Sequence, residues 1–137
     1  TFRWASEEAK RTAGEVVEMS AESGGENRFG WTLREPRGVI VAISPFNFPL
    51  NLVAHKVAPA LAVGAPIIVK PPPQAPSAQL VLAEILQKAG ADPAALQVLP
   101  CDNATAQRLA TDGRVRVLSF TGSANCTKPW ANQRQDD

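Results

Sequence analysis

The stretch that most constrains the fold comprises residues 38–50, which read GVIVAISPFNFPL. It begins with an apolar, largely β-branched run, and such a run is typical of a strand buried on both faces in a parallel sheet. Ser44 and Pro45 end the run, because proline has no N–H to donate to a neighbouring strand. Asn47 follows between two phenylalanines. The pattern predicts a central strand that carries one amide side chain to the carboxyl edge of a sheet, where open α/β sheets bind ligands.

Short apolar runs bounded by proline, glycine or polar residues predict three further strands, at residues 66–69, 96–99 and 115–120. The intervening segments have apolar residues at helical spacing, which predicts helices at residues 50–63, 77–90 and 104–111. Strands that alternate with helices form right-handed βαβ units. The predicted fold class is therefore α/β, an open and mostly parallel sheet with flanking helices.

The segment before residue 38 has a different pattern. Residues 2–19 place apolar side chains at three- and four-residue spacings, which predicts one amphipathic helix. Residues 21–27, AESGGEN, have the composition of a loop. Phe29, Trp31 and Leu33 then alternate with polar residues, and this alternation predicts a half-buried strand.

Composition excludes several classes of function. The formal net charge of +1 gives no electrostatic case for nucleic acid or an anionic membrane surface. No apolar run approaches the roughly 20 residues of a membrane span, and no signal peptide is visible, so the expected location is the cytoplasm. Cys101, Cys126 and His55 have no metal-binding spacing, and neither cysteine has a base or charge partner in sequence that would activate it.

Distinctive loops follow the four predicted strands, and in a parallel sheet all four lie at one edge. Lys70 offers a cation suited to ribose hydroxyls or phosphate, or is simply a solvated lysine at a strand end. Gly122 and Ser123 offer backbone N–H groups for a phosphate, or form an ordinary turn. Asn47 offers a donor to an oxyanion, or caps a turn. No G-x-G-x-x-G or P-loop pattern is present, so a bound dinucleotide needs another mode of phosphate binding.

Together these residues resemble the aldehyde dehydrogenase superfamily. The resemblance rests on residues 35–71, EPRGVIVAISPFNFPLNLVAHKVAPALAVGAPIIVKP, on SFTGS at residues 119–123, and on ASEEAKRTAGE upstream. It implies a Rossmann-like cofactor domain, NAD or NADP as the cofactor, and oxidation of a small aldehyde to a carboxylic acid through a thioester on a cysteine. The order and spacing of these motifs are far more specific than any one of them alone.

The resemblance also implies roles for individual residues. Asn47 donates to the oxyanion, and the backbone of Ile43, Ser44, Pro45 and Phe46 lines the nicotinamide ribose. Lys70 contacts the adenosine ribose, while Gly122 and Ser123 approach the pyrophosphate and nicotinamide. Pro73 stands where many NAD-preferring members have a glutamate that binds the ribose hydroxyls, which leaves use of NADP open.

The chain departs from the family pattern after residue 123. The sequence predicts a partial NAD(P)-binding domain at residues 1–123 and an atypical, non-native tail at residues 124–137, with the family's nucleophilic cysteine and general-base glutamate absent. Three readings follow: a cofactor-binding portion of an aldehyde dehydrogenase that is inactive alone, a non-catalytic dinucleotide-binding or assembly module, and an inert fragment. Exposed sheet edges and apolar helix faces predict homo-oligomerisation or aggregation.

Overall fold

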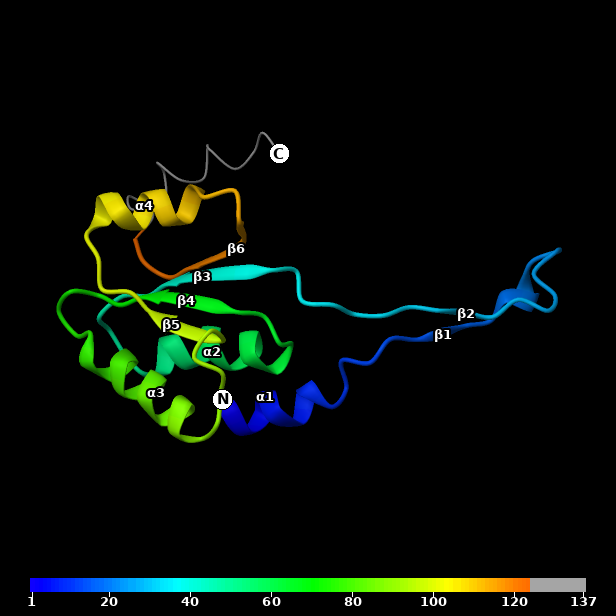
Figure 1. Ribbon diagram of the computed structural model, residues 1–137, viewed down its shortest axis with the longest axis horizontal. Coiled ribbons are helices and arrows are strands. Elements are labelled where there is room, and N and C mark those ends of the chain that lie inside the picture. The colour runs from blue at the N-terminus through cyan, green and yellow to red at the C-terminus, as the bar shows by residue number, and fades with distance from the viewer. Residues whose placement is uncertain (124–137) are drawn as a thin grey trace.

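The computed structural model describes residues 1–123 and has a four-stranded, fully parallel sheet at its centre (Figure 1). The strand order is β5-β4-β3-β6. The bounds of these strands are Val39–Ile43 for β3, Ile67–Lys70 for β4, Leu96–Val98 for β5 and Val115–Phe120 for β6. The predicted α/β class and the predicted parallel sheet are confirmed.

Helices cover both faces of this sheet (Figure 1). Helices α2 and α3 lie on one face and α4 on the other, while α1 packs beside α2. Their bounds are Phe2–Ala9 for α1, Asn51–Ala62 for α2, Ser77–Lys88 for α3 and Asn103–Thr111 for α4. The three helices predicted after residue 50 are therefore present, within one or two residues of their expected ends.

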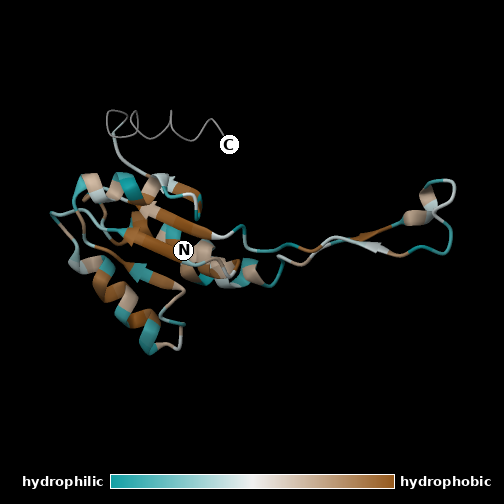
Figure 2. Cartoon of the chain, turned by 45° about the horizontal axis from the view of Figure 1, so that its top comes forward, coloured by the Kyte–Doolittle hydropathy of each residue, from teal (hydrophilic) through white to brown (hydrophobic). Residues whose placement is uncertain are grey.

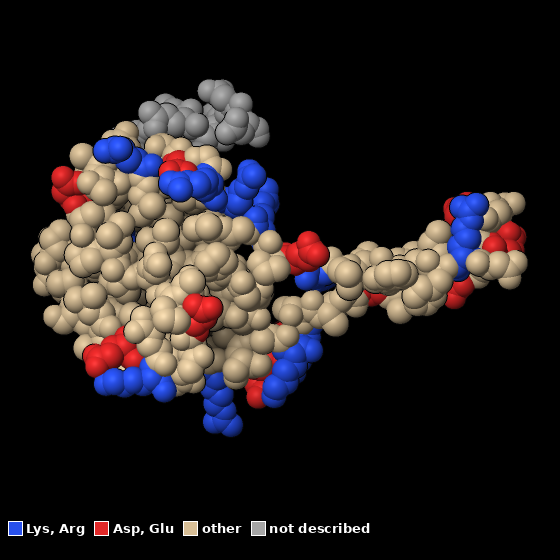
Figure 3. Space-filling view, viewed as in Figure 1, with Lys and Arg blue, Asp and Glu red and all other residues tan. Residues whose placement is uncertain are grey.

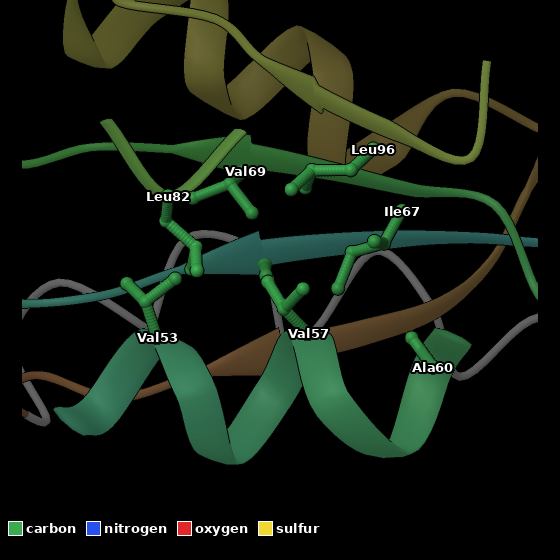
Figure 4. Close-up of a cluster of buried hydrophobic side chains, with 8 residues drawn as sticks. Val53, Val57, Ala60, Ile67, Val69, Leu82 and Leu96 are labelled. Atoms are coloured by element: carbon green, nitrogen blue, oxygen red, sulfur yellow. The ribbon is translucent and has the colours of Figure 1, made fainter. Parts of the chain in front are cut away.

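The main core lies between the sheet and helices α2 and α3 (Figure 4). Val53, Val57 and Ala60 of α2 point toward Ile67 and Val69 of β4. Leu82 of α3 and Leu96 of β5 complete the cluster. Burial of this apolar surface is the dominant favourable term in folding, so these contacts hold α2 and α3 against the sheet.

A second, smaller core lies on the opposite face. Val41 and Ile43 of β3 pack there with Ala106 of α4 and Val115 of β6. Successive side chains of a strand point to opposite faces, so β3 supplies Ala42 to one core and Val41 and Ile43 to the other. This arrangement explains why the sequence of β3 is apolar at every position.

The region between α1 and β3 corrects two predictions. Helix α1 ends at Ala9, and Val16–Val17 forms strand β1, which pairs antiparallel with β2 at Gly30–Trp31. A short 3-10 helix, η1, occupies Met19–Ala21 in the connection. Residues 12–35, here called the arm, project from the body as a narrow ribbon (Figure 1). The predicted helix of residues 2–19 is therefore present only as far as Ala9, and the predicted strand of residues 29–33 is present only at Gly30–Trp31, where Trp31 is exposed rather than half-buried.

Non-local pairing explains the first error. Gly14 lies so close to the Thr32 carbonyl that a Cβ atom on it would meet that oxygen at 1.4 Å. The Thr32 amide donates to the Glu15 carbonyl at 2.8 Å, and the Glu15 amide donates to the Thr32 hydroxyl at 2.9 Å. A spacing pattern within residues 2–19 contains no information about this distant partner. The second error concerns burial: Trp31 alternates with polar residues yet remains 59% exposed, because within residues 1–123 strand β2 belongs to a two-stranded ribbon with β1 and not to the central sheet.

No helix within residues 1–123 is long and apolar enough to cross a membrane. The charged side chains lie mainly around the rim of the body and at the tip of the arm, with tan surface between them (Figure 3).

Candidate functional site at the carboxyl edge of the sheet

The parallel register brings the loops after the strands to one edge. Ile43, the last residue of β3, is aligned with Lys70 at the end of β4 and with Phe120 at the end of β6. The Thr121 amide donates to the Ile43 carbonyl at 3.0 Å, and the Leu99 amide donates to the Val69 carbonyl at 2.9 Å. The predicted gathering of four loops at one edge is therefore confirmed.

The strand order identifies the most favourable place for a ligand along this edge. The chain steps outward from β3 to β4 to β5, then returns through α4 on the other face to place β6 on the opposite side of β3. The order thus reverses between β3 and β6, and ligands of open α/β sheets bind at such a switch point. Residues 44–47 follow β3 and residues 121–123 follow β6, so these two loops flank the switch point.

Lys70 is the most unusual side chain of this edge. The residue is only 5% exposed, and within residues 1–123 its ammonium has no hydrogen-bond or ion-pair partner. Ser44, directly after the aligned residue of the neighbouring strand, is also buried, and its hydroxyl has no partner there either. Buried polar groups are normally paired, so the buried Ser44 hydroxyl left without a partner, together with a lysine whose ammonium makes no bond within the described residues, fits a site that a polar ligand completes.

The other predicted site residues are more accessible. Asn47 is exposed beside the exposed ring of Phe46, and Pro73 is exposed after the buried Pro71 and Pro72. Gly122 and Ser123 are exposed as well. The Phe120 ring lies against Gly122, where a Cβ atom would meet it at 2.5 Å. Any side chain at position 122 would therefore collide with this ring, which explains the glycine there.

Asp102 belongs to this edge and was missed in the sequence. It is the N-cap residue of α4, and its carboxylate accepts a hydrogen bond from the Thr105 amide at 2.7 Å. Hydrogen bonding to Thr105 lowers the pKa of Asp102, and the nearby Lys70 charge lowers it further. An aspartate three residues before a helical amide is the signal that could have revealed this cap.

Cys101 precedes this cap, and burial raises the pKa of its thiol, against a smaller lowering by Lys70. A thiol with a raised pKa is protonated at neutral pH and is a poor nucleophile. This finding agrees with the prediction that Cys101 is unreactive. Cys126 lies outside the described residues. Within residues 1–123 no cluster of three potential metal ligands occurs.

The Asp102 cap predicts a pH dependence of stability. Because the pKa of Asp102 is lowered on folding, its contribution is complete above the ordinary pKa of a carboxyl and is lost as the pH falls through the folded value. Asp102→Asn keeps an acceptor without the charge. We expect the difference in Tm between wild type and Asp102→Asn to be constant above about pH 5 and to shrink below about pH 4. Thermal unfolding from pH 7 to pH 2 measures it, and a difference that does not vary with pH would contradict the assignment.

Lys56 was also missed, because no local pattern distinguishes it from a surface lysine. Its ammonium crosses from α2 to donate to the Ser119 hydroxyl of β6 at 2.9 Å. Partial burial lowers the pKa of Lys56. This bond ties the end of β6 to the helix that follows the Asn47 loop, so it helps to set the spacing of the two loops at the switch point.

The apolar hollows of the body are not lined by Ser44, Asn47, Lys70 or Gly122. A groove of about 650 Å³ runs between α1, α2 and α3, lined mainly by apolar residues such as Phe2, Val81 and Ile85. Hydrophobic lining alone gives no chemistry, whereas the carboxyl edge gathers a cation, a hydroxyl, an amide and exposed backbone. The carboxyl edge is therefore the candidate functional site.

Comparison with known proteins agrees with this geometry. Residues 1–135 match the model of the aldehyde dehydrogenase family. Aspartate-semialdehyde dehydrogenase 1 of Pseudomonas canavaninivorans is 46% identical over 122 residues, which are 89% of this chain and 26% of that protein. The 3-sulfolactaldehyde dehydrogenase of Priestia aryabhattai is 44% identical over 124 residues, 90% of this chain and 26% of that protein.

A solved structure shows the same arrangement of elements. The NADP-dependent glyceraldehyde-3-phosphate dehydrogenase of Bacillus halodurans C-125, complexed with NADP, superposes with a TM-score of 0.88 at 31% identity, covering 98% of this chain and 29% of that one. The chain thus spans about a quarter of the length of the relatives that it matches. By sequence and by fold, the chain belongs to the aldehyde dehydrogenase family.

Proposed function

We propose that this chain forms the dinucleotide-binding portion of an NAD(P)-dependent aldehyde dehydrogenase. The observation that carries the proposal is the pair of polar residues at the carboxyl edge, Lys70 at the end of β4 and Ser44 after the aligned residue of β3, where the buried Ser44 hydroxyl has no partner and the Lys70 ammonium makes no bond within the described residues. A dinucleotide is rich in hydroxyl and phosphate oxygens. These oxygens can accept the hydrogen bonds that the Lys70 ammonium and the Ser44 hydroxyl do not make within the described residues. The relative of known structure that carries NADP supports the same choice of ligand.

Each loop of the edge has a distinct proposed role. Lys70 donates to the hydroxyls of the adenosine ribose, and the backbone of residues 43–46 lines the nicotinamide ribose. The exposed backbone of Gly122 and Ser123 approaches the pyrophosphate. The Asn47 amide donates to the aldehyde oxygen as negative charge develops on it. The bound dinucleotide supplies the hydride acceptor.

The attacking group of the reaction lies outside residues 1–123 in this proposal. Cys101 is the one free cysteine within that range, and burial raises its pKa. A donor to an oxyanion cannot replace a nucleophile. The predicted domain of residues 1–123 and the predicted atypical tail of residues 124–137 stay predictions, since the tail lies outside the described residues. The predicted cytoplasmic location also stays a prediction.

One pair of measurements tests the proposal. The purified chain is titrated calorimetrically with NAD and with NADP, then assayed with propionaldehyde and each dinucleotide by the absorbance of the reduced nicotinamide. We expect binding heat without turnover. Turnover that Asn47→Ala abolishes would contradict the proposal that the nucleophile lies outside residues 1–123. A second outcome is that the chain binds a dinucleotide but supports no turnover, even when it is fused to the part of a relative that it does not match. That outcome would favour a non-catalytic module. Absence of heat with both dinucleotides would favour an inert fragment.

Pro73 is proposed to set the preference between NAD and NADP. It is exposed three residues after Lys70 and carries no charge, so it does not repel a 2′-phosphate. Pro73→Glu is expected to weaken NADP binding by about tenfold relative to NAD, because like charges at close range repel. Pro73→Gln is the matched control, since it has the same length without the charge. Equal effects of the two substitutions on NADP affinity would refute the electrostatic explanation.

The arm is proposed to mediate self-association. The rings of Phe29 and Trp31 contact each other in a tilted arrangement with 5.5 Å between their centroids, yet both remain largely exposed, and a brown apolar stretch lies along the arm (Figure 2). An isolated two-stranded ribbon is marginal in water, so burial against a second copy would stabilise it.

Light scattering tests the role of the arm. Wild type is expected to exceed the monomer mass, and Phe29→Ser combined with Trp31→Ser is expected to lower the association constant by at least about tenfold. Arg108→Ser, on the exposed side of α4, is the control that leaves association unchanged. A monodisperse wild-type monomer would exclude this role.

A further inference from the structure

Gln79 is a fully buried polar residue that the proposed function does not use. It lies in the first turn of α3, and none of its surface is exposed. Its side-chain amide Nε2 donates to the Pro49 carbonyl at 2.8 Å, whereas its Oε1 is buried without a partner. An apolar residue of similar volume would avoid the cost of this unpaired oxygen. Core packing alone therefore does not explain a glutamine here, and the contact with Pro49 becomes the feature of interest.

Pro49 ends the loop that carries Asn47, and the residue between them is strained. Phe48 has a φ of +49°, in the left-handed region that non-glycine residues rarely adopt. The proline that follows further disfavours helical backbone at Phe48. The Phe48 ring is 74% exposed, so packing of that ring does not hold the conformation. Strained backbone of this kind persists only where surrounding contacts fix it.

Two contacts hold this strained residue from its C-terminal side. The Leu52 amide of α2 donates to the Phe48 carbonyl at 3.0 Å. The Gln79 amide fixes the next carbonyl, that of Pro49, from the separate helix α3. The first contact continues a helix and forms wherever α2 begins. The second depends on one side chain reaching across from an element that starts nearly thirty residues later in the sequence.

We propose that Gln79 is the positioning residue for Asn47, and that its hydrogen bond to Pro49 selects the left-handed conformation of Phe48 and thereby the direction in which Asn47 points. This inference rests on the proposed role of Asn47 as a donor to the aldehyde oxygen. Without the Gln79 bond, Phe48 relaxes toward negative φ, and the Asn47 amide no longer occupies one position relative to Lys70 and Gly122.

The test uses the full chain without any cofactor, so that it does not depend on dinucleotide binding. Gln79→Met retains volume and removes the donor. In NMR spectra of labelled protein, we expect shifts or broadening of the Asn47 and Phe48 signals, and about 3- to 10-fold faster hydrogen exchange of the Leu52 amide. The Tm should change little, because removal of the unpaired Oε1 offsets loss of the hydrogen bond to the Pro49 carbonyl. Leu82→Met, also buried on α3, is the matched control and should leave these signals unchanged.

Rescue by glycine separates positioning from general stability. Glycine adopts positive φ without strain, so in a Phe48→Gly background the additional Gln79→Met change should alter the Asn47 signals little. Unchanged Asn47 and Phe48 signals in Gln79→Met would overturn the proposal, as would equal changes in both backgrounds. If Gln79→Met alone fails to fold, recovery of folding in the double variant supports the proposal, and failure of both overturns it.

Discussion

Lys70→Met is expected to weaken binding of NAD and NADP by about 10- to 100-fold. Hydrogen bonds from a charged donor contribute about 1.5 to 3 kcal/mol, and each 1.4 kcal/mol corresponds to about a tenfold change in affinity. The effect should be large because the Lys70 ammonium has no partner within residues 1–123, so the ligand supplies the bonds that the fold leaves open. Calorimetric titration of wild type and variant with each dinucleotide measures the change.

Lys88→Met is the matched control for this experiment. Lys88 lies in the last turn of α3, where its ammonium pairs with Glu84 at 2.6 Å on an exposed surface. Exposed pairs of this kind contribute little, so binding and stability should both remain close to wild type. If Lys70→Met and Lys88→Met bind a dinucleotide equally well, Lys70 does not contact the ligand and the proposed orientation of the adenosine end is wrong.

Ile67→Ala is expected to destabilise the fold by about 2 to 5 kcal/mol, because it removes buried methylene groups and leaves a cavity. Ile67 is almost completely buried between α2 and α3 and faces Val57 across the main core (Figure 4). Natural domains have about 5 to 15 kcal/mol of stability in total, so this loss is a large share of it. Urea unfolding should show the midpoint falling by more than about 1 M with an unchanged slope.

Ile85→Ala provides a comparison with identical chemistry and different burial. Ile85 lies on α3 and is 57% exposed. Substitutions at exposed positions usually change stability by about 0.5 kcal/mol or less, so its midpoint should stay close to wild type. Equal losses at Ile67 and Ile85 would mean that the apolar surface of α3 is buried in solution, for example against another chain.

Local patterns predicted the strands and helices after residue 38 because tertiary contacts reinforce them. The run at residues 39–43 is apolar at every position, and both faces of β3 are indeed covered, one by α2 and one by α4. The polar or proline residues that follow each run coincide with the strand ends. Prediction failed at residues 12–35, where Gly14 meets the Thr32 carbonyl and a distant strand replaces local helical hydrogen bonds.

The candidate site divides in the same way. The sequence suggested Asn47, Lys70, Gly122 and Ser123, because each follows an apolar run directly. It did not suggest Gln79 or Lys56, whose importance lies in single long-range contacts with Pro49 and Ser119. Glutamine and lysine on a helix are usually solvated, and no spacing rule identifies the one that reaches a loop or strand distant in the sequence.

The α/β class, the parallel sheet and the residues at the strand ends follow from local patterns, because the spacing of apolar residues and the positions of proline and glycine are properties of single segments. Three features emerge from the tertiary structure: β6 returns beside β3, the Ser44 hydroxyl is buried without a partner within residues 1–123, and the arm projects from the body. The physical reason is that burial and strand order arise from contacts between segments far apart in the chain, and a pattern within one segment does not encode its partner.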